Sequence, residues 1–260
     1  MTKAALITGA GRRLGRAMAL ALARRGHAVA VHYSSSARDA EETVSEARAL
    51  GVAAVALEAD LLDEAAVDGL VPRAAEALGM PLGVLINNAS IFEHDRVGTI
   101  TGESWDRAIG SNLRAPVFLT QAFAEQCTDA GTDANGEPLP AGLVVNMIDQ
   151  RVRKLTPEFT SYTIAKMGLW AFTRTAAQGL APHIRVNAIG PGPTLQGARQ
   201  SDRHFSDQRA ATPLGRGSDP DEICAALHFF LDAPGVTGQL LCLDGGQHLA
   251  WKTPDVLGVE

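Results

Sequence analysis

The stretch AALITGAGRRLGRAMALALAR, residues 4–24, decides the fold. It starts as a short apolar strand, passes through a glycine-rich turn, and enters a helix whose apolar face carries Leu14, Met18 and Leu22. The free N–H groups at the start of such a helix can bind a pyrophosphate, and the glycines allow a tight turn. The place of this turn, between the first strand and the first helix, favours a nucleotide-binding fold over an ordinary strand–helix connection.

The same alternation of strand and helix continues along the chain. Apolar, strand-like runs recur at residues 27–33, 52–59, 84–87, 143–148, 184–189 and 240–243. Helical patterns occupy residues 14–25, 38–50, 64–78, about 103–127, 160–179 and 219–231. Because the strands are continuously apolar, they predict a parallel sheet covered by helices on both faces. With residues 4–7 they predict a seven-stranded, doubly wound Rossmann-type α/β fold, a single domain over residues 1–260.

Two segments interrupt this alternation. Residues 128–142 (TDAGTDANGEPLPAG) are rich in turn formers and predict an inserted surface loop. Residues 190–218 form a long, irregular connection after the sixth strand, at the edge where ligands bind in open α/β sheets. We expect a substrate loop over residues 190–218, although a passive connection fits the same pattern.

The composition restricts the classes of partner. The 260-residue chain is 46% hydrophobic and carries a net charge of −6, which disfavours nucleic acid and anionic membranes. Cys127, Cys224 and Cys242 show no pairing pattern, so we expect reduced thiols in a cytoplasmic protein. The histidines lack metal-ligand spacing, so no metal site is predicted. No apolar run approaches the roughly 20 residues of a membrane span, and MTKAALITGA lacks a signal-peptide layout.

The end of the second strand predicts the kind of cofactor. It reads HYSSSAR, residues 32–38, with no carboxylate before Asp39. An NAD site usually has an acid here, whereas hydroxyls, an imidazole and Arg38, helped by Arg12, suit a 2′-phosphate. We therefore expect NADPH rather than NADH, the alternative being serines that only form a turn. Arg13, where many such loops have glycine, can bind the pyrophosphate and reach a substrate carbonyl or anion, or else face solvent.

Further cofactor contacts are predicted at the ends of later strands. Asp60 can accept a hydrogen bond from an adenine amino group, the small residues at 88–90 allow a ribose to approach, and Pro191 lies beside the expected nicotinamide. The predicted cofactor-binding set is Gly9, Arg12, Arg13, Leu14, Gly15, His32, Tyr33, Ser34, Ser35, Ser36, Asp60, Leu61, Asn88, Ala89, Ser90, Asn112, Met147, Tyr162, Lys166, Pro191, Gly192 and Thr194.

Residues 146–166 suggest the chemistry. Tyr162 and Lys166 lie four residues apart and share one helix face, so a Lys166 cation can lower the pKa of the phenol and let Tyr162 donate a proton near neutral pH. The strand just upstream ends in Asp149, where a ketone reductase would place a serine. A carboxylate–phenol pair can hold and relay the proton that a C=N bond needs at nitrogen when a hydride adds to its carbon. The alternative is that Asp149 pairs with Arg151 or Arg153.

Several motifs now stand in order along the chain. They are TGAGRRLG at 8–15, NNAS at 87–90, SN at 111–112, YTIAK at 162–166, GPG at 190–192 and DGG at 244–246. Over essentially the whole chain they resemble the short-chain dehydrogenase/reductase family. That resemblance implies Asn112 as a proton-relay residue and a homotetramer as the assembly.

The departures from the family pattern resemble its pteridine reductase branch, which includes bacterial dihydromonapterin and dihydrofolate reductases. The departures are Arg13, Asp149, the SIF at 90–92 and the HYSSS at 32–36. The resemblance implies that Phe92 stacks on a pterin opposite the nicotinamide, although a core aromatic is the alternative for Phe92. The implied substrate-binding set is Arg13, Ser90, Phe92, Asp149 and Tyr162. The implied catalytic set is Asp149, Tyr162, Lys166 and Asn112.

The sequence therefore predicts an NADPH-dependent reductase of pterins, converting dihydropterins and possibly dihydrofolate to their tetrahydro forms. Its partners are predicted to be a small-molecule pterin and copies of itself. Two other functions fit the same motifs. One is a related reductase acting on an unrelated carbonyl or an activated C=C bond. The other is a non-catalytic NADPH-binding protein, against which the Tyr162–Lys166 pair and Asn112 argue.

Overall fold

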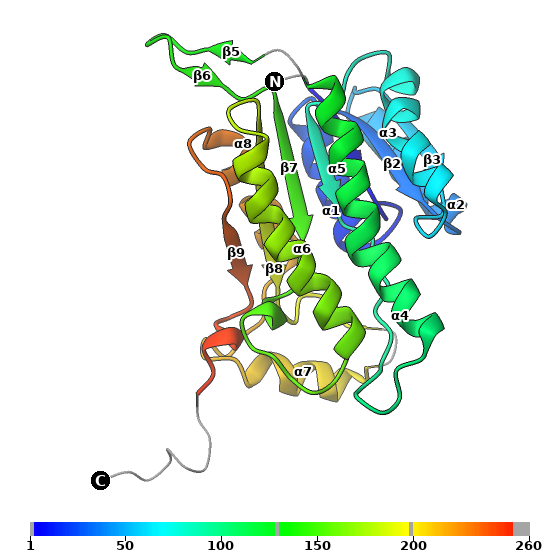
Figure 1. Ribbon diagram of the computed structural model, residues 1–260, viewed down its shortest axis with the longest axis vertical. Helices are drawn as coiled ribbons and strands as arrows, with labels where there is room; N and C mark the ends of the chain where they lie inside the picture. The colour runs from blue at the N-terminus through cyan, green and yellow to red at the C-terminus, as the bar shows by residue number, and fades with distance from the viewer. Residues whose placement is uncertain (1–2, 128–129, 198–199, 252–260) are drawn as a thin grey trace.

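A computed structural model describes residues 3–127, 130–197 and 200–251 (Figure 1). Seven parallel strands form one sheet in the order β3-β2-β1-β4-β7-β8-β9. The strands are β1 (Ala4–Ile7), β2 (Ala28–Tyr33), β3 (Ala54–Glu58), β4 (Val84–Asn87), β7 (Gly142–Met147), β8 (Ile184–Pro191) and β9 (Leu240–Leu243). The predicted doubly wound fold is confirmed. The strand order reverses between β1 and β4, and open α/β sheets bind ligands beyond the carboxyl ends of strands at such a point.

Helices cover both faces of the sheet because the side chains of each buried strand alternate between two cores. Ala5 and Ile7 of β1 face one core, which is closed by α1 (Arg13–Arg24), α2 (Ala37–Ala49) and α8 (Pro220–Asp232). Ala4 and Leu6 face the other, which is closed by α3 (Glu64–Leu78), α5 (Ala115–Gln126) and α6 (Thr160–Gly179). Figure 1 shows α5 and α6 lying along β7 on this second face. The sheet is therefore buried on both sides and serves as a rigid support for its carboxyl edge.

The segment in which helical patterns were predicted, about 103–127, has three parts. It consists of α4 (Gly102–Ile109), a π-helical turn η1 (Gly110–Arg114) and α5. Single π turns are frequent at functional sites because they change the direction in which side chains project.

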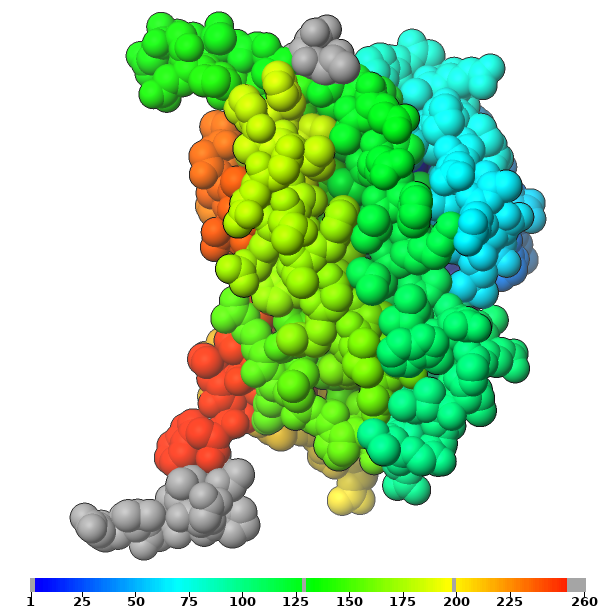
Figure 2. Space-filling model, in the orientation of Figure 1, coloured from blue at the N-terminus to red at the C-terminus, as the bar shows by residue number. Residues whose placement is uncertain are grey.

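The two interrupting segments contain more regular structure than the sequence predicts. The predicted surface loop includes a hairpin of β5 (Gly131–Thr132) and β6 (Pro138–Leu139), which projects from the body of the molecule (Figures 1 and 2). The connection after β8 includes a helix, α7 (Asp202–Ala210), none of whose residues is buried. Two short 3-10 turns, η2 (Gln150–Val152) and η3 (Gln247–Leu249), follow β7 and β9. Of the helices in the described residues, none is long and apolar enough to cross a membrane.

Candidate active site

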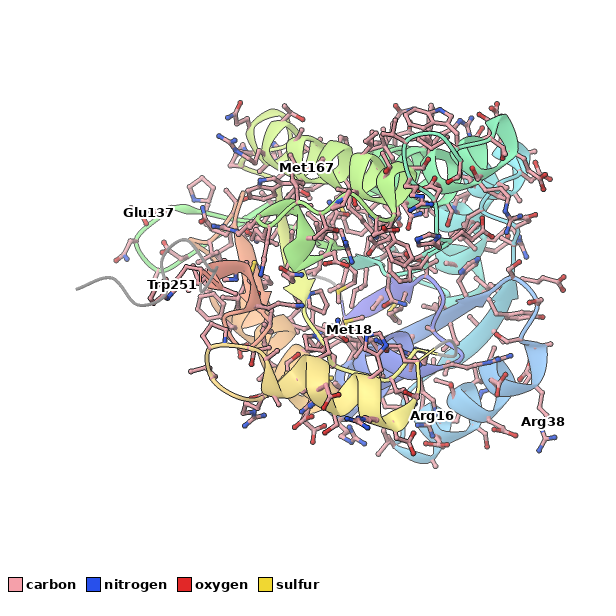
Figure 3. All side chains as sticks on the ribbon, turned by 90° about the horizontal axis from the view of Figure 1, so that it is seen from below. Arg16, Met18, Arg38, Glu137, Met167 and Trp251 are labelled. Carbon is pink, nitrogen blue, oxygen red and sulfur yellow. The ribbon has the colours of Figure 1, made fainter. Side chains whose placement is uncertain are left out.

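A cleft of about 530 Å³ lies at the carboxyl edge of the sheet. Figure 3 looks onto this edge, with α7, in yellow, lying below the strand ends in that view. Most of the predicted site residues line the cleft. They are Gly9, Arg12, Arg13, Leu14, Gly15, His32, Ser34, Asp60, Leu61, Asn88, Ala89, Ser90, Met147, Asp149, Tyr162, Lys166, Pro191, Gly192 and Thr194. Five further lining residues were not predicted, namely Leu62, Ile91, Ser111, Ile148 and Leu195. Each of the five is next in sequence to a predicted residue, so extending the motifs by one position would have found them.

The glycine-rich turn is held close to the end of β4. Gly9 has a φ of 61° and a Cβ on it would lie 3.0 Å from Ala89 Cα, so both the backbone angle and the space favour glycine. The Thr8 hydroxyl accepts hydrogen bonds from the backbone N–H groups of Asn88 and Ala89, each at 2.9 Å. The Asn88 amide donates to the carbonyl oxygens of Thr8 and Gly9, at 2.8 Å and 3.1 Å. Asn88 therefore shapes the turn as well as lining the cleft.

His32 holds the turn from its other side, and this corrects one expectation. Its Nδ1 accepts from the Gly9 N–H at 3.0 Å, and its Nε2 lies 3.0 Å from the Ala59 carbonyl oxygen, to which it donates. Burial lowers the pKa of His32 to about 4, so the ring is neutral at physiological pH. The prediction that this imidazole helps to bind a 2′-phosphate is wrong, because both of its nitrogens already bind the backbone.

The other residues predicted for a 2′-phosphate lie at the surface. Arg12 pairs with Asp39 at 2.6 Å and Arg38 pairs with Glu42 at 3.0 Å, and all four side chains are exposed. Exposed pairs contribute at most about 1 kcal/mol, so an anionic ligand can compete for such an arginine. Arg12 and Ser34 line the cleft. Tyr33, Ser35 and Ser36 are not among its lining residues.

Arg13 connects the glycine-rich turn to the loop after β8. Its guanidinium donates to the carbonyl oxygens of Gln196 at 2.7 Å and Leu195 at 3.1 Å. Its φ of 54° lies in the left-handed region, which costs a residue other than glycine roughly 1–2 kcal/mol. These two bonds exclude the alternative that Arg13 only faces solvent. Arg13 joins the two loops that enclose this end of the cleft.

The base of the loop after β8 is fixed by its own hydrogen bonds. The hydroxyls of Thr194 and Ser218 lie 2.6 Å apart, although 24 residues separate them in sequence. The Arg209 guanidinium of α7 donates to the carbonyl oxygens of Pro193 and Ser218, both at 2.8 Å. A Cβ at Gly217 would clash with the Pro193 carbonyl oxygen, so glycine is needed for this close approach. The two ends of the loop therefore meet, and Thr194 is held in the cleft wall.

The predicted reacting residues meet at the end of β7. The Tyr162 hydroxyl donates to Asp149 Oδ2 at 3.0 Å, and Asp149 Oδ1 accepts from the Arg151 backbone N–H at 2.8 Å. The Lys166 ammonium donates to the Met147 carbonyl oxygen at 2.8 Å. Asp149 thus contacts Tyr162 directly, and its bond to Arg151 involves the backbone. The carboxylate and the phenol form one hydrogen-bonded pair.

The electrostatics of this pair differ from the prediction. Burial and the neighbouring Asp149 carboxylate raise the pKa of Tyr162 well above its usual value, so the prediction that Lys166 lowers it is wrong. Burial also raises the pKa of Asp149. Burial lowers the pKa of Lys166 to about 8. The environment therefore retains a proton on the Tyr162–Asp149 pair, since losing it would leave two adjacent negative charges.

Asn112 lies behind the cleft wall in the π-helical turn. It is fully buried, and its side-chain amide donates to the carbonyl oxygens of Ile91 at 2.9 Å and Ala108 at 3.0 Å. Its Oδ1 accepts from the Ser90 hydroxyl at 2.7 Å. Ser90 in turn contacts the Tyr162 hydroxyl and opposes the rise in its pKa. Within the described residues, Asn112 therefore reaches the cleft through Ser90 and Ile91, and its proton-relay role stays a prediction.

Phe92 lies beside the reacting pair, in contact with a residue that was not predicted. Its ring stacks on that of Phe159, with centroids 4.2 Å apart and planes 8° apart. Its ring also meets that of Tyr162 edge-on, at 4.7 Å and 76°. Phe92 is 42% exposed, so the alternative of a core aromatic does not hold. It is not among the residues lining the cleft, although its neighbour Ile91 is.

The start of α6, which carries Tyr162 and Lys166, is capped from a distance. Phe159, at the N-cap, has a φ of 61° and makes no side-chain capping bond. Instead, the buried Asp95 accepts two hydrogen bonds from this helix start. The Asp95 carbonyl oxygen accepts from the Phe159 N–H at 2.7 Å, and the Asp95 carboxylate accepts from the Ser161 N–H at 3.1 Å. This contact ties the segment after β4, which carries Phe92, to the helix with the reacting tyrosine. No sequence pattern marks it, because 64 residues separate Asp95 from Phe159.

No group of three or more histidine, cysteine, aspartate or glutamate side chains in the described ranges could hold a metal ion. The polar groups of the cleft are hydroxyls, amides, arginines, the His32 imidazole, the Asp60 carboxylate and the Tyr162–Asp149–Lys166 cluster. These groups suit an organic ligand with anionic and planar parts.

Comparison with known proteins gives the family. The family model described as enoyl-(acyl carrier protein) reductase matches residues 9–248. The chain is 30% identical to the 3-oxoacyl-[acyl-carrier-protein] reductase FabG of Staphylococcus aureus, over 96% of this chain and 99% of that protein.

Two solved structures carry the comparison further. FolM alternative dihydrofolate reductase 1 from Brucella canis, complexed with NADP, is 41% identical with a TM-score of 0.88, covering 98% of this chain and 97% of that one. The Brucella suis FolM alternative dihydrofolate reductase 1, also with NADP, is 42% identical with a TM-score of 0.89, covering 97% of each chain. These neighbours confirm the predicted resemblance to the pteridine reductase branch. The chain belongs to the short-chain dehydrogenase/reductase family of oxidoreductases.

Proposed function

We propose that the protein is an NADPH-dependent pterin reductase, which reduces a dihydropterin to the tetrahydropterin. The observation that carries this proposal is the 3.0 Å hydrogen bond from the Tyr162 hydroxyl to the Asp149 carboxylate. A ketone reductase needs a hydroxyl donor at this point, whereas a ring C=N bond needs a group that supplies a proton to nitrogen. The similarity to the two FolM reductases supports the same reading.

The residues at the glycine-rich turn fit a dinucleotide. A Cβ at Gly15 would clash with the Gly9 carbonyl oxygen, so the helix start comes close to the turn, as binding of a pyrophosphate at α1 requires. Arg12, Ser34 and Asp60 line the cleft, and the proposed roles are binding of the 2′-phosphate by Arg12 and Ser34 and of the adenine by Asp60. Lys166, which donates to the Met147 carbonyl oxygen, is proposed to bind the nicotinamide side of the cofactor together with Met147. When bound, NADPH supplies the hydride for the reduction.

The residues of this chain supply the proton. Reduction of a C=N bond adds a hydride at carbon and a proton at nitrogen. The proposed proton donor is Tyr162, whose hydroxyl is hydrogen-bonded to Asp149. Proton loss from the pair would leave a phenolate beside a carboxylate in a buried site, which is unfavourable. The raised pKa of Asp149 lets this carboxyl take up a replacement proton from solvent and return it to Tyr162. The pair thus acts as one proton-holding unit.

Other residues are proposed to bind and orient the flat substrate. Phe92 provides an aromatic face next to Tyr162, and stacked rings are favoured by about 0.5–1.5 kcal/mol beyond their burial. Arg13 and Ser90 line the cleft, and the proposed roles are donation by the Arg13 guanidinium to a ring carbonyl and contact of Ser90 with both cofactor and substrate.

We further propose a cytoplasmic homotetramer, with residues 1–260 as one catalytic domain. The exposed apolar side chains of Phe118, Ile164 and Met167 on α5 and α6 support an assembly through this face.

A second candidate is reduction of a 3-oxoacyl or other carbonyl substrate, which the similarity to FabG favours. The two functions make opposite demands on position 149. A carbonyl reductase should tolerate or improve with Asp149→Ser, whereas a pterin reductase should lose turnover.

The roles of the pair are tested by turnover and cofactor binding measured on the same variants. Asp149→Ala and Tyr162→Phe are each expected to abolish NADPH-dependent pterin turnover while NADPH still binds, as followed by nucleotide fluorescence. Asp133→Asn, in the exposed hairpin, is the matched control and should behave as the unmodified protein. Turnover that survives either substitution, or loss of NADPH binding in both, would contradict the proposed roles.

A further inference from the structure

Phe159 has a backbone conformation that its side chain disfavours. Its φ of 61° and ψ of 48° lie in the left-handed region, where glycine or asparagine is usual and a bulky side chain is an outlier. Such outliers persist only where the surrounding structure enforces them, and they concentrate at functional sites.

The backbone of Phe159 is fixed by its neighbours. Its N–H donates to the Asp95 carbonyl oxygen at 2.7 Å, and the first turn of α6 is bonded to the Asp95 carboxylate through the Ser161 N–H. The Arg151 guanidinium carbon lies 5.3 Å from the Phe159 ring centroid, within the range of a cation–π contact. The His94 ring meets it edge-on at 5.1 Å. The ring of Phe159 is thus held on several sides.

The fixed ring of Phe159 supports Phe92. The centroids of the two rings lie 4.2 Å apart and the rings are nearly parallel. Phe92 also meets the Tyr162 ring edge-on. Phe92 is 42% exposed and lies in a loop, so these ring contacts restrict its orientation. Of the two, the contact with Phe159 sets the plane of the ring, because stacked rings must be parallel.

We propose that Phe159 is a positioning residue, which sets the ring plane of Phe92 so that it matches a flat heteroaromatic substrate beside Tyr162. This inference rests on the proposed function, in which Phe92 binds the pterin. It assigns no chemical step to Phe159, which acts through Phe92. In this strained backbone conformation the Phe159 ring lies over Phe92 while its N–H bonds to Asp95, so both contacts accompany the strain.

The test is a double-mutant cycle on the dihydropterin kinetics of the full chain. Phe159→Leu is expected to raise KM about 2- to 10-fold, the range for loss of a stacked pair, with kcat changed less than about twofold. Phe92→Leu should raise KM by a similar or larger factor. The double variant should be no worse than Phe92→Leu, because Phe159 has nothing left to position. Phe159→Tyr, which retains the stacking ring, should restore the KM.

A variant that suits the backbone separates positioning from folding. Phe159→Gly accepts a positive φ without strain, which offsets part of the stability lost with the ring contacts, so its thermal stability should be no lower than that of Phe159→Leu, while its KM rises as in Phe159→Leu. Multiplicative effects in the double variant would overturn the proposal, and so would an unchanged KM in both Phe159 variants when Phe92→Leu raises it. If Phe92→Leu also leaves KM unchanged, the stacking role of Phe92 under the proposed function fails together with this inference. Absence of pterin turnover by the unmodified protein overturns both.

Discussion

Replacing the charge at position 149 tests how the protein holds its proton. The Tyr162 hydroxyl donates to Asp149 Oδ2 at 3.0 Å, so ionising the phenol would place two negative charges side by side. At an effective dielectric constant of about 20, two unit charges 3.0 Å apart repel by roughly 5 kcal/mol, or roughly four pKa units as an upper bound. Asp149→Asn keeps an acceptor oxygen and removes the charge. We therefore expect the pKa of Tyr162 to fall by at least about one unit.

The chain makes this measurement unusually direct, because it contains two tyrosines, Tyr33 and Tyr162. In a Tyr33→Phe background, the near-ultraviolet absorbance of tyrosinate follows the ionisation of Tyr162 alone. The titration with Asp149→Asn should lie at lower pH than the titration without it. Asp133→Asn in the same background serves as the control and should leave the titration in place. A Tyr162 that ionises at the same or higher pH in Asp149→Asn would refute the reasoning.

Three further predictions concern the cofactor, the helix start and the histidines. Arg12→Gln should raise KM for NADPH roughly 10- to 100-fold in steady-state assays, because it removes a charge-assisted hydrogen bond to the 2′-phosphate. KM for NADH should stay nearly unchanged, and equal effects on both cofactors would contradict 2′-phosphate binding. Asp95→Ala should lower the free energy of unfolding in urea by about 1 kcal/mol, whereas Asp95→Asn, which can still cap, should lose less; equal losses would count against the capping role. Burial lowers the pKa of His27 and of His32 from 6.5 to about 4, so the unfolded chain binds more protons between these values. The free energy of unfolding should therefore fall as the pH is lowered through this window, by up to roughly 3 kcal/mol per histidine. Urea unfolding at a series of pH values measures this fall, which should be smaller for His27→Asn than for the unmodified protein.

The fold was predictable because its signals are local. Continuous apolar runs predict seven buried parallel strands, and α6 begins and ends at the residues that its pattern indicates, Thr160–Gly179. The helix α7 was missed because none of its residues is buried, so it has no apolar periodicity. Its hold on the loop comes from Arg209, whose partners Pro193 and Ser218 are distant in sequence. The hairpin at residues 131–139 was read as a loop because its strands are two residues long.

The site was predictable in its membership and less so in its electrostatics. Motif positions brought Tyr162, Lys166 and Asp149 together, since the carboxyl ends of parallel strands share one edge. The pKa of Tyr162 depends on burial and on a contact across 13 residues, and spacing gives neither. The neutral state of His32 follows from two backbone partners that only the folded chain supplies. Phe159 carries no signal at all, because a positive φ at a phenylalanine is enforced by tertiary contacts.

The most direct test of the proposed function compares substrates and position 149 together. Consumption of NADPH is measured with dihydrobiopterin, dihydromonapterin and dihydrofolate, and with a 3-oxoacyl thioester and small ketones, for the unmodified protein and for Asp149→Ser. The account predicts that the unmodified protein turns over pterins and that Asp149→Ser lowers pterin turnover roughly 100- to 10,000-fold. With the carbonyl substrates, the unmodified protein should be no more active than Asp149→Ser. Turnover confined to the carbonyl substrates, or pterin turnover that Asp149→Ser leaves intact, would contradict it.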